Sequence, residues 1–247
     1  MRHSLLILLL FCVQQAVAQD PPEKYSAIWD KVNSMDPGSP AIQKELKKLR
    51  KENPSDPWIF WISGLTCNPV NGQEEAAAFY QQAIAADSTF PHAYYNLAQT
   101  FGEESESDLK ERVKLFTKAV TYDQSLGFAF LGRGQAYLQL GNYDAALADC
   151  DNARSCEDFD LLQADALQLE VLWKQGKKEE AFYLLGKSDF SGGGMWGTDF
   201  ELLLAAIYTE SGDLENACGC YRRAAEPYEM MGEELPAEIQ KGLEKCK

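Results

Sequence analysis

The stretch Gly127–Asp160, GFAFLGRGQAYLQLGNYDAALADCDNARSCEDFD, decides the fold of this 247-residue chain. It contains two segments with apolar or small residues at helical spacing, and the run Gly141-Asn142-Tyr143-Asp144 between them predicts a turn. The residues that mark the two helices are Phe130, Gly134 and Tyr137 in the first and Ala146, Cys150 and Ala153 in the second. We expect Gly134 and Ala146 to let the two helices pack closely, with the aromatic rings filling the gaps beside them.

The same pattern recurs on both sides of this stretch. It predicts five units, at about 57–90, 91–126, 127–160, 161–195 and 198–231. The second unit is longer than the third, which predicts a longer acidic loop over Glu103–Asp108. Because one helix pair cannot bury its apolar face alone, the units are expected to stack on one another.

Residues 19–56 predict a further, degenerate helix pair before the five units. Its apolar residues Tyr25, Ile28, Trp29 and Val32 have the spacing of one helix face. Ser39-Pro40 is typical of a helix start, with a serine N-cap and a proline at the first helical position. Residues 232–247 place Ile239, Leu243 and Cys246 on one stripe, which predicts a helix that caps the last unit. Ser191–Gly194 predicts either a plain loop or a hinge.

On these residues, Gly127–Asp160 closely resembles the tetratricopeptide repeat (TPR) family, and the neighbouring units resemble it less closely. The resemblance implies an all-α fold: a right-handed α-solenoid of TPR helix-turn-helix repeats with a C-terminal capping helix. It also implies a concave groove, lined by the first helix of each repeat, in which such proteins bind ligands.

The residues that the resemblance places on this groove are Trp58, Trp61, Leu65, His92, Tyr95, Asn96, Gln99, Phe128, Leu131, Gln135 and Leu138. The aromatic members are suited to act as anchors, and the amides are suited to donate and accept hydrogen bonds. The alternative is that some of these side chains pack between repeats or under the N-terminal helix pair.

One activity of the family is disfavoured. Chaperone-binding TPR domains resemble each other in a Lys/Asn/Arg clamp that grips a C-terminal carboxylate, and Asn96 occupies one clamp position. However, Trp61, Leu65, Phe128 and Gly132 stand at the positions that would supply the rest of the clamp. We therefore expect a ligand that is an extended or helical protein segment with exposed apolar side chains.

Residues 1–18 predict a secretory signal peptide. Met1-Arg2-His3 is positively charged, Ser4–Val13 is apolar but short for a bilayer span, and Ala16-Val17-Ala18 suits cleavage before Gln19. A lipoprotein signal ending at Cys12 is the alternative, but Leu10-Phe11 lacks the small residues that such a signal has. The sequence thus predicts export, to a bacterial periplasm or outside the cell, with no membrane insertion after cleavage.

Composition and motifs disfavour several other functions. The formal net charge of −15 argues against nucleic acid and anionic membranes as partners. After signal removal His92 is the single histidine, and no Gly-x-Ser-x-Gly, His-Glu-x-x-His or phosphate-binding glycine loop occurs. The sequence therefore predicts no catalytic residues, no metal site and no cofactor.

Six cysteines remain after signal removal: Cys67, Cys150, Cys156, Cys218, Cys220 and Cys246. Cys67 and Cys150 stand where the repeat requires a packed side chain, which predicts buried free thiols. Cys218 and Cys220 point in different directions on a helix, and one of them could reach Cys246 if the capping helix folds back. This pairing is a hypothesis, since sequence alone does not fix disulfide connectivity.

The leading hypothesis is an exported, non-enzymatic TPR scaffold or adaptor that binds a protein or peptide segment and acts in cell-envelope assembly. The alternative is an accessory protein that binds a small molecule or glycan through the same aromatic residues.

Overall fold

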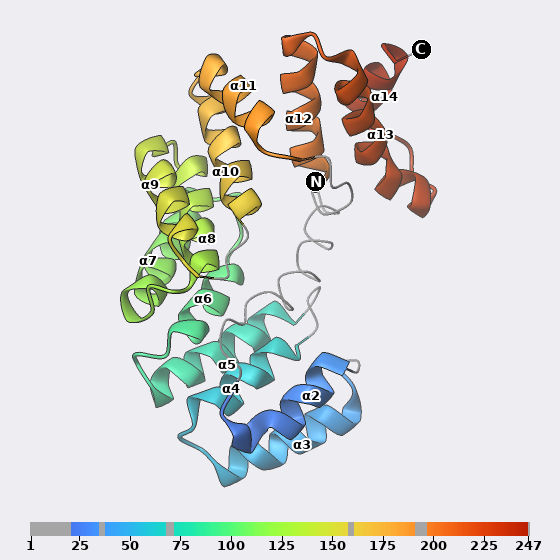
Figure 1. Cartoon of the computed structure of the whole chain (residues 1–247). Helices are drawn as coiled ribbons and strands as arrows, with labels where there is room; N and C mark the ends of the chain where they lie inside the picture. The colour runs from blue at the N-terminus through green and yellow to red at the C-terminus, as the bar shows by residue number, and fades with distance from the viewer. Residues whose placement is uncertain (1–20, 35–37, 68–71, 158–160, 191–196, 247) are drawn as a thin grey trace. The chain divides into compact units, whose positions relative to one another are not determined.

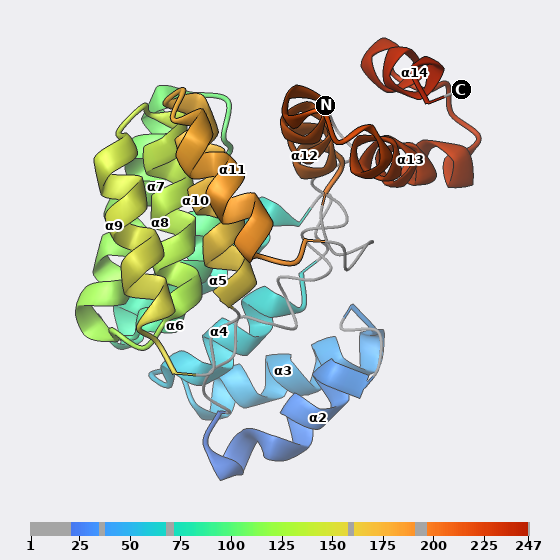
Figure 2. The same ribbon diagram turned by 45° about the horizontal axis from the view of Figure 1, so that its top comes forward.

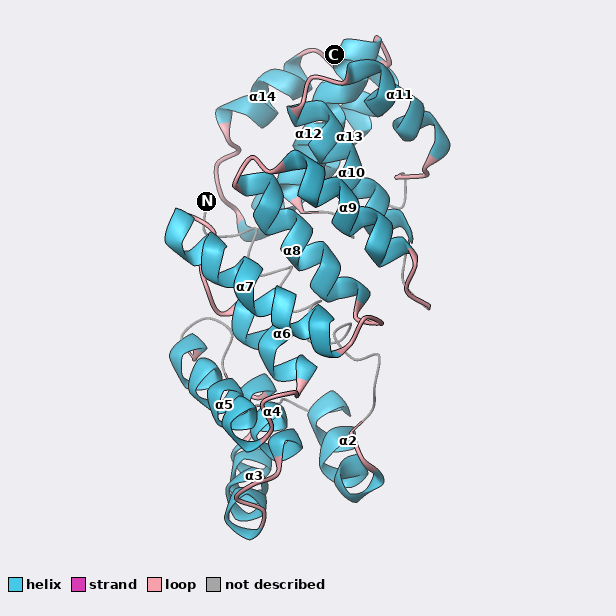
Figure 3. Ribbon diagram, turned by 90° about the vertical axis from the view of Figure 1, so that its left-hand side faces the viewer, coloured by secondary structure: helices cyan, strands magenta, loops and turns pink. Residues whose placement is uncertain are grey.

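The computed structural model describes residues 21–34, 38–67, 72–157, 161–190 and 197–246. The expected signal peptide and the Ser191–Gly194 segment lie outside these residues. Every regular element in the described ranges is a helix, and none of them is a strand (Figure 3). The all-α expectation is confirmed.

The helices follow one another along the chain. They are η1 (Glu23–Tyr25), α2 (Ser26–Ser34), α3 (Pro40–Glu52), α4 (Pro57–Leu65), α5 (Gln73–Ala86), α6 (Pro91–Gln99), α7 (Glu106–Tyr122), α8 (Gly127–Gln139), α9 (Tyr143–Arg154), α10 (Leu161–Lys174), α11 (Lys178–Lys187), α12 (Thr198–Ser211), α13 (Leu214–Met231) and α14 (Ala237–Glu244). The chain divides into two compact units between Val171 and Leu172, within α10. We describe the N-terminal unit and the C-terminal unit separately.

The N-terminal unit is a series of helix pairs (Figure 1). Helices α4 and α5, α6 and α7, and α8 and α9 pack as pairs, while α5 on α6 and α7 on α8 join each pair to the next. Glycines allow the close approach that the sequence predicted: Gly134 lies against Leu167 and Asp149, and a Cβ atom on Gly64 would lie 2.3 Å from the ring of Tyr80. One core cluster of buried residues includes members from Tyr25 to Ala164, and a second is formed by Leu138, Ala146, Cys150, Leu167 and Val171.

Side-chain caps fix where several helices begin. The Ser39 Oγ accepts a hydrogen bond from the Ile42 N–H, so the predicted serine cap before Pro40 is confirmed. Asp56 caps α4 before Pro57 in the same way. Glu106–Asp108 forms the first turn of α7, capped by Ser105, and not a part of the loop as predicted. The loop between α6 and α7 nevertheless spans 100–105, against only 140–142 between α8 and α9.

The connections between pairs reuse one turn. The Asp87 carboxylate accepts hydrogen bonds from the backbone N–H and hydroxyl of Thr89, at 2.9 and 2.7 Å. Asp123 does the same with Ser125, at the same two distances. Both turns follow a second helix and precede a first helix, so a short acidic turn sets the start of each new pair.

The C-terminal unit ends in the expected capping helix (Figure 2). Helix α14 packs on α13, where Ile239 is fully buried against Ala224 and Ala225. A disulfide joins Cys218 of α13 to Cys246, which lies two residues after the end of α14. The predicted pairing with Cys246 is confirmed, and Cys218 is the partner. Cys220 remains a free, buried thiol.

Loss of this disulfide should destabilise the C-terminal unit. The bond closes a loop with a sequence separation of 28, for which the chain-entropy model gives about 3–4 kcal/mol. We expect Cys246→Ser to lower the free energy of unfolding by about this amount, as measured by denaturant titration. The matched control is Cys156→Ser, which alters a half-buried free thiol. Equal stability losses in both variants would contradict the assignment.

Candidate functional site

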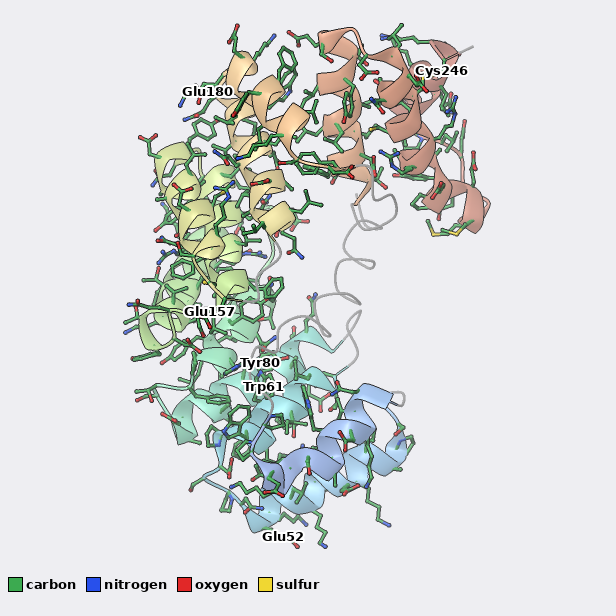
Figure 4. All side chains as sticks on the ribbon, viewed as in Figure 1. Glu52, Trp61, Tyr80, Glu157, Glu180 and Cys246 are labelled. Carbon is green, nitrogen blue, oxygen red and sulfur yellow. A yellow bond between two sulfur atoms is a disulfide. The ribbon has the colours of Figure 1, made fainter. Side chains whose placement is uncertain are left out.

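Trp61 lies at the centre of an aromatic cluster that comprises Trp29, Trp58, Trp61, Phe90 and His92. Its indole stacks on that of Trp29 from α2, with ring centroids 5.5 Å apart and an interplanar angle of 27°. Trp58 and Phe90 approach it edge-on. Figure 4 labels Trp61 on α4. Its side chain has no exposed surface, so the rings of the aromatic cluster already occupy its surroundings.

A buried hydrogen bond fixes the position of Trp61. Its Nε1–H donates to the Oδ1 of Asn96 on α6, at 2.6 Å. Asn96 is itself buried. The amide that occupies the clamp position in the family resemblance therefore binds a side chain of its own protein.

His92 packs on the same indole rings. Its ring centroid lies 5.5 Å from that of Trp58 and 5.4 Å from that of Trp61. The side chain is 2 % exposed, and neither ring nitrogen has a hydrogen-bond partner among the residues that the structure describes. Burial lowers the pKa of His92, while the Asp123 carboxylate opposes this shift. The imidazole is therefore neutral at neutral pH.

The structure places part of the predicted set of binding residues in the interior. Trp61, Leu65, His92, Tyr95, Asn96 and Leu138 are buried. For Trp61 the reason is that α2 brings Trp29 against its face, and Tyr95 packs on Phe116 of α7, with ring centroids 5.8 Å apart. In this conformation these side chains stabilise the interior and do not face a ligand. Trp61 thus follows the alternative given by the sequence, in which some of these side chains pack under the N-terminal helix pair.

Five of the predicted residues keep part of their surface accessible: Trp58, Gln99, Phe128, Leu131 and Gln135. We refer to these five as the first-helix face, because each comes from the first helix of a pair. Phe128, Leu131 and Gln135 are spaced by three and four residues along α8, so they share one side of that helix. The first two also pack partly on the core, which fixes their positions.

Gln99 has a defined orientation within the first-helix face. Its Nε2 donates to the hydroxyl of Tyr95 at 3.2 Å, and its Oε1 accepts from Arg112 at 3.4 Å. Arg112 also donates to the carbonyl of Phe101 and pairs with Glu103 at 3.0 Å. The Gln99 Oε1 already accepts a hydrogen bond from the Arg112 guanidinium. A ligand would therefore bond to the side-chain NH₂ of Gln99, as the acceptor of its hydrogen bond.

Sequence reasoning missed the ion pairs inside the helix pairs. Arg133 of α8 makes a two-pronged contact with Asp149 of α9, at 2.9 and 2.7 Å, and reaches Thr117 of α7 at 3.2 Å. Hydrogen bonding to Asp149 raises the pKa of Arg133. Arg223 and Glu201 form a similar contact in the C-terminal unit. Since Arg133 is the only basic residue of α8, that helix offers no free cation for a carboxylate.

The free thiols are not activated for nucleophilic chemistry. Burial raises the pKa of Cys67 to about 11 and those of Cys150 and Cys220 to about 12. The thiolate is the reactive form, so these groups are almost fully protonated at neutral pH. Within the described residues, no group of three or more His, Cys, Asp or Glu side chains is arranged to hold a metal ion.

Residues 129–153, which lie within α8 and α9, match the family model of the tetratricopeptide repeat. The chain carries a tetratricopeptide repeat. A search of curated proteins gave no significant match.

Several solved structures share the fold of the chain. PilW, a widely conserved type IV pilus biogenesis factor, is 15% identical over 89% of this chain and 96% of its own, with a TM-score of 0.67. PilF of Pseudomonas aeruginosa is 15% identical over 94% of this chain and 95% of its own, with a TM-score of 0.60. YrrB, a TPR protein with an unusual peptide-binding site, is 23% identical over 73% of this chain and 91% of its own, with a TM-score of 0.52. At these identities the likeness shows the fold alone.

Removing the Asn96 amide should destabilise the TPR protein. In Asn96→Ala, the Trp61 Nε1–H stays buried without its acceptor, which costs about 1–3 kcal/mol. We expect a loss of this size in denaturant unfolding, together with a change in tryptophan fluorescence. Asn152→Ala, at an exposed position of α9, is the matched control and should change stability little. Unchanged stability and fluorescence in Asn96→Ala would show that the buried bond does not form.

Proposed function

We propose that this protein is an exported, non-catalytic TPR scaffold that binds a segment of another protein on the first-helix face. The observation that carries the proposal is the side of α8 that presents Phe128, Leu131 and Gln135. These residues lie in or beside the repeat matched by the family model, and they remain partly exposed although their neighbours are buried. YrrB, which shares the fold, is described as having a peptide-binding site.

The chemistry of the first-helix face suits an uncharged segment. Phe128 and Leu131 offer apolar contact, and Gln99 and Gln135 offer amides that can bond to the backbone of an extended chain. Arg133 is paired with Asp149 and has no role in attracting an acidic terminus. We infer a ligand that presents apolar side chains and backbone carbonyls.

Two features support export. The signal-like residues 1–18 lie outside the described part of the chain, so their support comes from sequence alone. The Cys218–Cys246 disulfide suits an oxidising compartment such as the bacterial periplasm or the exterior of the cell. The shared fold with PilW and PilF makes a role in cell-envelope assembly a reasonable extension of the proposal. Within the described ranges, no helix has the length and apolar character of a bilayer span.

The alternative function, binding of a glycan or small molecule, has less support. It relied on an aromatic platform, and the faces of the central ring, Trp61, are covered by Trp29 and neighbouring rings. A sugar needs an uncovered aromatic face for stacking, and of the clustered tryptophans on α4 only Trp58 keeps accessible surface.

Selection from a phage-displayed library of random linear peptides provides the test. Peptides enriched on the full chain should carry apolar side chains. Their binding should weaken at least about tenfold in the double variant Phe128→Ala/Gln135→Ala, because truncation of a hot-spot anchor removes more than about 1.4 kcal/mol of binding free energy. Isothermal titration of one synthetic peptide measures this change.

The matched control for this test is Tyr183→Ala, which removes a side chain that is 75 % exposed on α11. It should leave peptide affinity unchanged, and circular dichroism should show both variants folded. Equal affinities for the double variant and the unmutated protein would contradict the proposal, as would enrichment of purely acidic peptides.

A further inference from the structure

We infer that Glu103 makes the first-helix face selective for uncharged segments, because its carboxylate occupies the Arg112 guanidinium beside Gln99. Without Glu103, the same face should accept a segment that carries an acidic side chain next to this guanidinium. The selectivity rests on the proposed function, whereas the masking of Arg112 does not. The sequence predicted Glu103 only as part of an acidic loop.

Glu103 lies in the loop between α6 and α7 and is linked to both helices that carry the amides of the first-helix face. Its Oε1 pairs with Arg112 at 3.0 Å, and its Oε2 accepts a hydrogen bond from the Gln139 Nε2 at 3.0 Å. Arg112 in turn donates to the Oε1 of Gln99 on α6. Gln139 follows Gln135 by four residues on α8, so it continues the side of that helix that carries Gln135. Glu103 therefore lies at one end of the face.

Arg112 is fixed in its position by contacts that do not include Glu103. Its residue is buried, and it donates a hydrogen bond to the carbonyl of Phe101 at 3.1 Å. Its guanidinium also lies over the ring of Phe116, at 5.7 Å from the ring centroid. Loss of the Glu103 carboxylate should therefore leave the guanidinium in place. A buried cation without its partner is costly, so it favours the approach of another carboxylate.

Glu103 is the exposed member of this ion pair. Its side chain is 44% exposed, against 7% for that of Arg112. A ligand therefore meets the carboxylate before it meets the guanidinium. The carboxylate repels an acidic side chain, and it occupies the N–H groups that such a side chain would bind. An uncharged segment meets neither restriction, so the pair keeps this end of the face neutral.

Glu104 provides a matched comparison within the same loop. It is exposed, as Glu103 is, and it carries the same charge. Its carboxylate lies beside Gly102, where an added Cβ atom would be 3.1 Å from the Glu104 Oε2. Replacement of either glutamate by alanine removes one negative charge from the loop. Replacement of Glu103 also removes the ion pair with Arg112.

Arg133 of α8 provides an internal reference. It makes a two-pronged contact with Asp149, at 2.9 and 2.7 Å, and it donates to the Thr117 hydroxyl at 3.2 Å. None of these residues belongs to the loop that carries Glu103, so the contact should persist in variants of that loop. A change confined to Arg112 therefore reports the loss of Glu103 and not a general loosening of the repeats.

Chemical modification of the full chain tests the masking without any ligand. An arginine-selective dicarbonyl reagent, combined with peptide mass spectrometry, gives the modification rate of each arginine. We expect Glu103→Ala to raise the rate at Arg112 severalfold and to leave the rate at Arg133 unchanged. In Glu104→Ala, both rates should equal those of the unmutated protein. Equal rates at Arg112 in the two variants would overturn the inference.

Peptide affinity tests the change in selectivity. In a synthetic series, each residue of a library-selected peptide is replaced in turn by glutamate or by glutamine, and binding is measured by isothermal titration. At one position of the series, the glutamate peptide should bind Glu103→Ala at least about tenfold more tightly than its glutamine counterpart, the gain expected of a charge-assisted hydrogen bond. The preference should shrink as salt is added, since it depends on charge.

The unmutated protein and Glu104→Ala should bind no glutamate peptide more tightly than its glutamine counterpart. A preference for glutamate of the same size in Glu103→Ala and Glu104→Ala would overturn the inference, because it would reflect the net charge of the loop and not the release of Arg112. Circular dichroism checks that both variants are folded.

The two measurements separate this inference from the proposed function. If Arg112 becomes reactive in Glu103→Ala but no library peptide binds the unmutated protein, the proposed function fails and the masking of Arg112 stands. If a peptide binds the first-helix face and Glu103→Ala shows no preference for glutamate, the proposed function stands and the inference fails.

Discussion

A helix pair that is apolar on one face must be covered by a neighbour, and at the end of a stack no further repeat is present to do this. In the N-terminal unit, α2 supplies the cover by placing Trp29 on Trp61. In the C-terminal unit, α14 covers the last pair, and a disulfide to Cys218 holds it there. The two covers differ in chemistry: the first includes ring stacking, and a covalent bond holds the second.

The N-terminal cover leaves Trp61 and Asn96 in the interior. Trp61 and Asn96 occupy positions that bind ligands in resembling proteins, yet here they bond to each other in the interior. The predicted residues that keep accessible surface are Trp58 on α4, Gln99 on α6, and Phe128, Leu131 and Gln135 on one side of α8. The first helices of the N-terminal unit therefore contribute residues both to the interior and to the accessible surface.

The sequence predicted the helices, the Ser39 cap and the α14 stripe because each depends on residues close together in the chain. The family resemblance also singled out the side of α4 that carries Trp61. It could not show which neighbour covers that side, because Trp29 reaches Trp61 from another helix pair. The Arg133–Asp149 pair was missed for the same reason: its two residues lie on different helices, and no local pattern links them.

We propose that the side of α8 with Phe128, Leu131 and Gln135 binds the ligand, whereas Trp61 packs in the interior. Hydrogen exchange of the full chain at neutral pH, with and without a saturating library-selected peptide, tests this most directly. We expect the added protection to concentrate in α6 and α8, and the amides of α11 and α12 to exchange as before. Added protection confined to α11–α13, or to α2 and α4 alone, would contradict it.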